Sequence, residues 1–154
     1  MKKVLVVNPG STSLKFKLIE FPSEEILASG KMERIGESRS PYIIKVGKLE
    51  LTGAIPALDY KTGVDWLLQL LAGNGIPQEQ APLKSITELS AVGFKAVHGG
   101  KFNSNRGATI LTDEVVSEME RMLPTALVHN KAYLQAIQCF ADVAPDIPRV
   151  ALFE

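Results

Sequence analysis

The sequence predicts an α/β domain built around a mixed β-sheet. Strand patterns fill the first third of the chain, and strand and helix patterns then alternate towards its end. The composition agrees, because 45% hydrophobic and 22% charged residues in a chain of 154 residues suit one buried core and one domain.

The first third predicts two hairpins. Val4–Val7 is a continuous apolar run, typical of a strand buried on both faces. From Thr12 apolar and polar side chains alternate, which gives the next strand one face of each kind. The two faces are Leu14, Phe16 and Leu18, and Ser13, Lys15 and Lys17. A glycine turn at Asn8–Ser11 joins both strands. A third strand and a second hairpin are expected at residues 26–32, 42–46 and 48–52.

Helix and strand patterns alternate in the rest of the chain. Asp59 or Thr62 is expected to cap a helix with an apolar stripe of Val64, Leu67, Leu68 and Leu71. Two further helices are expected after the capping residues Thr112 and Asn130. Strands are predicted at Leu89–His98 and Val150–Phe153, with loops at residues 36–41, 76–88 and 101–107.

Charge and cysteine content exclude several classes of protein. Seventeen basic residues balance seventeen acidic ones, which predicts no nucleic-acid partner and no anionic membrane partner. No apolar run approaches the ~20 residues of a membrane span. The single Cys139 excludes an internal disulfide and fits a cytoplasmic protein. Its helical apolar surroundings predict a role in the core.

The segment from Asn8 to Lys15 combines a glycine turn, hydroxyl groups and a lysine. Such a turn presents backbone N–H groups to an anion, and the alternation places Ser11, Ser13 and Lys15 on one face. The segment therefore predicts a site for phosphate or a metal–phosphate complex. An ordinary hairpin turn is the alternative, because Asn, Pro, Gly and Ser are common turn residues. The spacing does not match the phosphate loop G-x-x-x-x-G-K-[ST].

Three further features carry possible chemistry, each with a plain structural alternative. In Gly93–Gly100, Lys95 and Val97 share a face, which suits a short carboxylate with an alkyl tail; the alternative is a strand with a snorkelling lysine. His129 precedes a helix, where anions bind; the alternative is a surface histidine beside the cap Asn130. Glu154 ends a buried strand, where a carboxylate can bind Mg²⁺; the alternative is a charged chain end.

Together these segments resemble the acetate and short-chain acyl kinase family. The family motifs N-x-G-S-S-S-L-K, G-H-R-V-V-H-G-G, A-P-L-H-N and V-F-D-T have counterparts here in the same order. These are Asn8–Lys15, Gly93–Gly100, Ala126–Asn130 and the end of the chain at Phe153-Glu154. The resemblance covers essentially the whole chain, and the acyl group it implies is acetate, propionate or butyrate.

The resemblance implies a ribonuclease H-like lobe of the actin, Hsp70 and sugar-kinase superfamily. It implies phosphoryl transfer from ATP to a carboxylate such as acetate, with Mg²⁺. Asn8 and Glu154 would hold the metal, and Ser11, Ser13 and Lys15 would line the phosphate path. Val97 and Val128 would contact the acyl tail. Lys95, His129 and Glu154 would be the catalytic positions.

The chain departs from the family at three points. Lys95 stands where the family has arginine, and Glu154 where it has aspartate. The family's second lobe, which holds most of the nucleotide site and the homodimer interface, is absent from residues 1–154. We therefore expect one inactive N-terminal lobe of an acyl kinase. The alternatives are a non-catalytic relative that acts as a binding or regulatory module, and a different phosphotransferase such as a sugar kinase.

Overall fold

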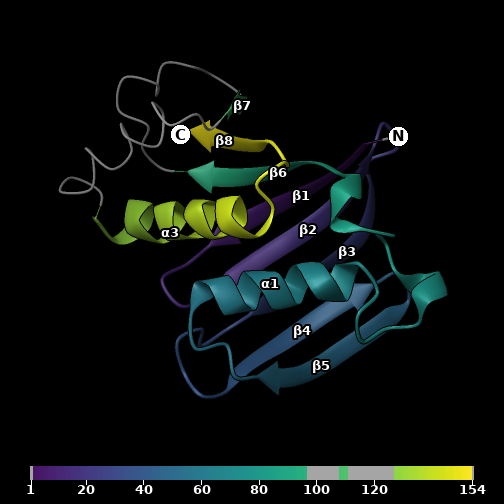
Figure 1. Cartoon of the computed structure of the whole chain (residues 1–154), viewed down its shortest axis with the longest axis horizontal. Coiled ribbons are helices and arrows are strands. Elements are labelled where there is room, and N and C mark those ends of the chain that lie inside the picture. Colours follow the sequence, from purple (N-terminus) through teal and green to yellow (C-terminus); the bar gives the residue numbers. More distant parts are fainter. Residues whose placement is uncertain (1, 97–107, 111–126, 154) are drawn as a thin grey trace.

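The computed structural model describes residues 2–96, 108–110 and 127–153. Eight strands form one sheet in the order β5-β4-β3-β2-β1-β6-β8-β7 (Figure 1). The first five are sequential antiparallel neighbours: β1 Lys2–Pro9, β2 Leu14–Phe21, β3 Glu25–Met32, β4 Ser40–Val46 and β5 Leu49–Ile55. Both predicted hairpins and the third strand are thereby confirmed. The predicted turn at Asn8–Ser11 starts too early, because Asn8 and Pro9 belong to β1. The prediction that β1 is buried on both faces is wrong, because Val6 is 39% exposed.

The second half of the sheet is mainly parallel. Strand β6 (Leu89–Ala96) lies parallel to β1, and β8 (Arg149–Phe153) lies parallel to β6. The short edge strand β7 (Ala108–Ile110) pairs antiparallel with β8 and was not predicted. The sheet is therefore mixed, as the order of sequence patterns indicated.

Two helices cover one face of this sheet (Figure 1). Helix α1 (Tyr60–Leu71) begins at Asp59, whose carboxylate accepts a 2.7 Å hydrogen bond from the Thr62 amide. Hydrogen bonding to the side chain of Thr62, and then to its amide, lowers the pKa of Asp59. The amide bond identifies Asp59, and not Thr62, as the cap. Two short 3₁₀ helices, η1 (Gln78–Gln80) and η2 (Ile86–Glu88), lie in the predicted connecting loop.

Helix α3 (Leu127–Val143) connects back to β8. It begins three residues before Asn130, so the prediction that Asn130 caps this helix is wrong. A single polar side chain is a weak marker of a helix boundary, because asparagine also occurs within helices. The helix predicted after Thr112 lies outside the described residues.

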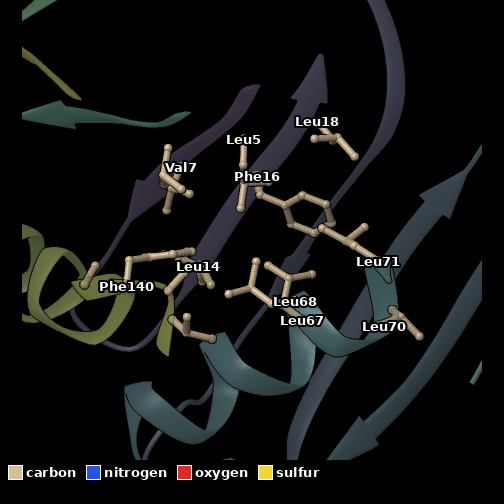
Figure 2. Close-up of a cluster of buried hydrophobic side chains, with 14 of the residues drawn as sticks. Leu5, Val7, Leu14, Phe16, Leu18, Leu67, Leu68, Leu70, Leu71 and Phe140 are labelled. Carbon is tan, nitrogen blue, oxygen red and sulfur yellow. The ribbon is translucent and has the colours of Figure 1, made fainter. Parts of the chain in front are cut away.

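The core fills the space between the helices and the sheet. Figure 2 shows side chains of β1 and β2 facing α1 and Phe140 of α3. Phe140 meets Phe94 of β6 edge to face, with ring centroids 5.4 Å apart. Cys139 is also buried, and burial raises the pKa of its thiol to about 11, which fits the expected core role. The fully buried members of this core include Leu5, Leu14, Leu18, Leu67, Leu68, Leu71, Phe94, Ile137 and Phe140.

The face of the sheet opposite the two helices is called the open face, and the alternation along the strands directs every second side chain towards it. Lys15 and Lys17 are exposed there, whereas Leu14, Phe16 and Leu18 are buried under the helices. Among the described elements, both α-helices lie on the other face (Figure 1). Neither of these two helices therefore covers the open face.

Candidate functional site

The turn between β1 and β2 occupies residues 10–13. The Gly10 amide donates a 2.9 Å hydrogen bond to the Ser13 carbonyl oxygen, which closes the turn. The Thr12 carbonyl oxygen accepts a 2.8 Å bond from the Ile35 amide, so the turn is also fixed to the loop after β3. These bonds hold the backbone of the predicted phosphate site in one conformation.

Tyr60, the first residue of α1, hydrogen-bonds to the backbone of this turn. Its hydroxyl contacts the carbonyl oxygens of Gly10 and Ser13 and donates its proton to one of them at a time. The side chain is only 2% exposed. Burial raises the pKa of Tyr60 to about 12, against the opposing effect of its bond to Ser13. The phenol therefore stays protonated and remains a donor throughout the neutral range.

The serines lie in the turn and not in a strand. Strand β2 begins at Leu14, so the prediction that strand alternation places Ser11 and Ser13 on the face of Lys15 is wrong. The side chain of Ser13 folds back over Gly10, where an added Cβ would lie 2.4 Å from the Ser13 Oγ. Gly10 is therefore needed for this close approach, and Ser11 is exposed at the tip of the turn.

Asn8 and Lys15 are directly opposite each other in the β1–β2 pair. Both side chains are exposed on the open face. The parallel neighbour β6 brings a third predicted residue to this row: Phe94 pairs with Val7, and the backbone of Lys95 follows one position later. Asn8, Lys15 and the backbone of Lys95 thus occupy adjacent positions across β2, β1 and β6.

Two of the remaining predicted residues, Val128 and His129, lie in the described backbone. Helix α3 starts near the ends of β6 and β8 (Figure 1), and Val128 and His129 lie in its first turn. Val97 and Glu154 lie outside the described residues; in the sequence they directly follow β6 and β8. The carboxyl ends of parallel strands are the usual ligand-binding edge of an α/β sheet.

A groove of about 590 Å³ runs along the open face from Asn8 and Lys15 across β2, β3 and β4. Its charged lining also includes Lys17, Lys31 and Lys45, which were not predicted as site residues. We call it the lysine groove. The alternating pattern in β2–β4 indicates that these lysines share a face of the sheet. It does not show that they lie close together, because that depends on the register between the strands.

The described residues offer few ligands for a bare metal ion. In residues 2–96, 108–110 and 127–153, no group of three or more His, Cys, Asp or Glu side chains is arranged to hold one. Asn8 contributes a neutral amide oxygen, and its neighbour Lys15 is cationic. This donor set fits Mg²⁺ that keeps its water shell and arrives with phosphate groups, and it does not form a complete metal cage.

Comparison with known proteins identifies the family of the chain. The sequence profile of the acetokinase family matches residues 3–154. This chain belongs to the acetokinase family. The expected ribonuclease H-like lobe is confirmed with it, because acetokinase structures share the chain's mixed sheet and helices.

Acetate kinases from Bacillus velezensis and Bacillus subtilis are each 37% identical to this chain. The alignments cover all of the chain and 37% of each relative, so the chain spans about a third of their length. The crystal structure of Porphyromonas gingivalis acetate kinase superposes with a TM-score of 0.87 at 30% identity, over 99% of this chain and 37% of that one. A propionate kinase from Francisella tularensis gives a TM-score of 0.85 at 25% identity, with the same coverage.

Within residues 2–96, 108–110 and 127–153, neither α-helix is long and apolar enough to cross a bilayer.

Proposed function

We propose that residues 1–154 form the N-terminal lobe of an acetate-kinase-like phosphotransferase, which converts ATP and a short-chain carboxylate to an acyl phosphate and ADP. The observation that carries the proposal is the row of Asn8, Lys15 and the Lys95 backbone beside the fixed turn at residues 10–13. Membership of the acetokinase family and the names of its relatives support the reaction class.

In the proposed reaction a carboxylate oxygen attacks the γ-phosphorus, and the bond from that phosphorus to the ADP oxygen breaks. The bonding electrons leave with ADP. Such a transfer depends on positioning and charge stabilisation more than on covalent chemistry. Lys15, Ser11 and Ser13 would hold phosphoryl oxygens, and the turn N–H groups would add neutral donors. Lys95 would neutralise the carboxylate as it approaches.

The other predicted residues would act around this transfer. Val97 and Val128 would bound the acyl tail, and His129 would donate a hydrogen bond to the phosphoryl group. Bound Mg²⁺ supplies positive charge to the phosphate oxygens. Asn8 would hold it through its water shell, with Glu154 as the carboxylate partner. These residues supply one wall of the site, and the nucleotide would need contacts from sequence beyond it.

The isolated chain is expected to show no phosphoryl transfer, whereas a chimera should be active. In the chimera this chain replaces the matching part of Bacillus subtilis acetate kinase, which supplies the rest of that relative's length. Acyl phosphate would be trapped with hydroxylamine, with acetate, propionate and butyrate as acceptors. Lys15→Gln should lower the chimera's rate by about 100-fold, because it removes a charge-stabilising donor. Lys61→Gln, at an exposed position of α1, is the matched control and should leave the rate unchanged.

Turnover by the isolated chain would contradict the proposed single lobe. A folded chimera that transfers no phosphate would contradict the proposed reaction.

The double substitution Lys95→Arg and Glu154→Asp should raise the rate of the chimera by roughly tenfold. Arginine presents a planar fork that holds two oxygens, and lysine does not. Aspartate would also place its carboxylate one methylene closer to the strand end. Initial rates of both single variants and the double variant would measure each contribution.

An inactive chimera that becomes active only with both substitutions would favour the non-catalytic alternative. Unchanged or lower rates would show that Lys95 and Glu154 are suited to their positions.

A further inference from the structure

Cross-strand register gathers four lysines in the lysine groove. Lys15 of β2 lies directly opposite Lys31 of β3. Two positions along, Lys17 and Lys45 flank Ser29, one from each neighbouring strand. Strands lie about 4.8 Å apart and alternate residues about 7 Å apart, so the four backbone positions fit a patch of roughly 10 by 7 Å.

The described lining of the groove contains no acidic side chain, and two glutamates lie next to its lysines. Glu33 forms an ion pair with Lys31 at 3.0 Å, and this lysine lowers the pKa of the Glu33 carboxyl. Glu50 of β5 is opposite Lys45 in register, but no ion pair joins them in the described part of the chain. Within that same part, Lys15 and Lys17 have no carboxylate within 4.0 Å. The groove therefore carries a net positive charge.

This arrangement has a cost in the free protein. Like charges directly opposite each other on one face of a sheet destabilise it. The floor between the lysines is partly apolar, since Val6 is 39% and Ile43 is 45% exposed. Low-polarity walls strengthen the attraction between a cation cluster and an anion. An anion that touches several lysines at once would remove the repulsion.

We propose that the lysine groove binds a chain of two or more linked phosphate groups, extending from Lys15 towards Lys45. A single phosphate would reach only one row of lysines, whereas a linked chain would cross both rows. The chain could belong to a nucleotide or to inorganic polyphosphate, which have this chemistry in common. The proposal goes beyond the proposed function, because Lys17, Ser29, Lys31 and Lys45 have no part in the phosphoryl transfer.

The test is calorimetric titration of the full 154-residue chain with inorganic triphosphate, ATP and orthophosphate. We expect triphosphate to bind more tightly than orthophosphate by at least tenfold. The variant Lys31→Gln/Lys45→Gln should weaken triphosphate binding by about tenfold, since it removes two charge-assisted contacts. Lys61→Gln/Lys84→Gln is the matched control, because both lysines are exposed outside the groove and the change in net charge is equal.

Thermal unfolding gives a second readout in the same samples. Without anion, the groove variant should unfold at a higher temperature than the parent chain, because repulsion is relieved. Added triphosphate should raise the midpoint of the parent more than that of the variant. Equal effects of ATP and triphosphate would assign binding to the phosphates alone, and tighter ATP binding would assign the ligand to a nucleotide.

Equal triphosphate affinity of parent and groove variant would overturn the proposal, as would equal weakening by the control variant. None of these measurements requires phosphoryl transfer. If the groove binds triphosphate but the chimera is inactive, the proposed function is rejected and this inference is retained. If the chimera is active but the groove does not bind triphosphate, this inference is rejected and the proposed function is retained.

Discussion

Replacing Phe140 with alanine is expected to lower the free energy of unfolding by about 4 kcal/mol. The side chain is fully buried and packs edge to face on Phe94, so its loss removes apolar burial and an aromatic contact and leaves a cavity. Phe94 lies next to Lys95 on β6, and Phe140 lies on α3. The substitution should therefore also loosen the helix that carries His129. Urea unfolding followed by circular dichroism would measure the loss.

Leu58→Ala is the control for this measurement. Leu58 is 65% exposed, so its truncation should change the unfolding free energy by less than about 0.5 kcal/mol. A loss below about 2 kcal/mol for Phe140→Ala would mean that α3 repacks readily on the sheet, contrary to the close packing of Phe140 on Phe94.

Replacing Tyr60 with phenylalanine should remove a pH dependence of stability as well as a hydrogen bond. Near neutral pH the loss of the buried bond should cost about 1–3 kcal/mol, because carbonyl oxygens at Gly10 and Ser13 lose their donor. The pKa of Tyr60 rises from the ordinary tyrosine value of 10.0 in the unfolded chain to about 12 in the folded one. Between these values the unfolded state releases a proton that the folded state keeps, so stability falls as the pH rises.

This contribution is fully present below pH 10 and is lost as the pH approaches 12. A shift of that size corresponds to about 2–3 kcal/mol. Unfolding free energies at a series of pH values from 9 upward would show a steeper decline for the parent chain than for Tyr60→Phe. Tyr42→Phe removes a tyrosine outside the turn and should keep the decline. Parallel curves for the parent and Tyr60→Phe would contradict the burial of the Tyr60 phenol, which is what raises its pKa.

Much of the fold was predictable because its signals are local. Alternation predicted the faces of Leu14, Phe16 and Leu18. The two candidate caps, Asp59 and Thr62, predicted the start of α1 to within a few residues. Strand β7 carried no comparable signal, because three residues are too few to show a period and its partner β8 lies about 40 residues further on.

The candidate site was less predictable, because it depends on contacts between distant segments. The turn at residues 10–13 owes its conformation to Tyr60 and Ile35, which the residues Asn8–Ser13 give no means of anticipating. Lys31 and Lys45 are unremarkable in the sequence, and only the register of β2, β3 and β4 brings them beside Lys15 and Lys17. The sequence motifs pointed to Asn8, Lys15 and Lys95, but they did not predict the lysine groove beside these residues.

The alternation of β1 and β2 has an evolutionary consequence. Leu5, Val7, Leu14 and Phe16 are buried in the core, while the alternate residues Val6, Asn8 and Lys15 are exposed on the open face. Selection can therefore change the open-face residues with little penalty to the folded state. Gain or loss of a lysine at position 17, 31 or 45 would change which anions the domain binds. Related proteins could therefore differ in ligand preference while keeping the same fold.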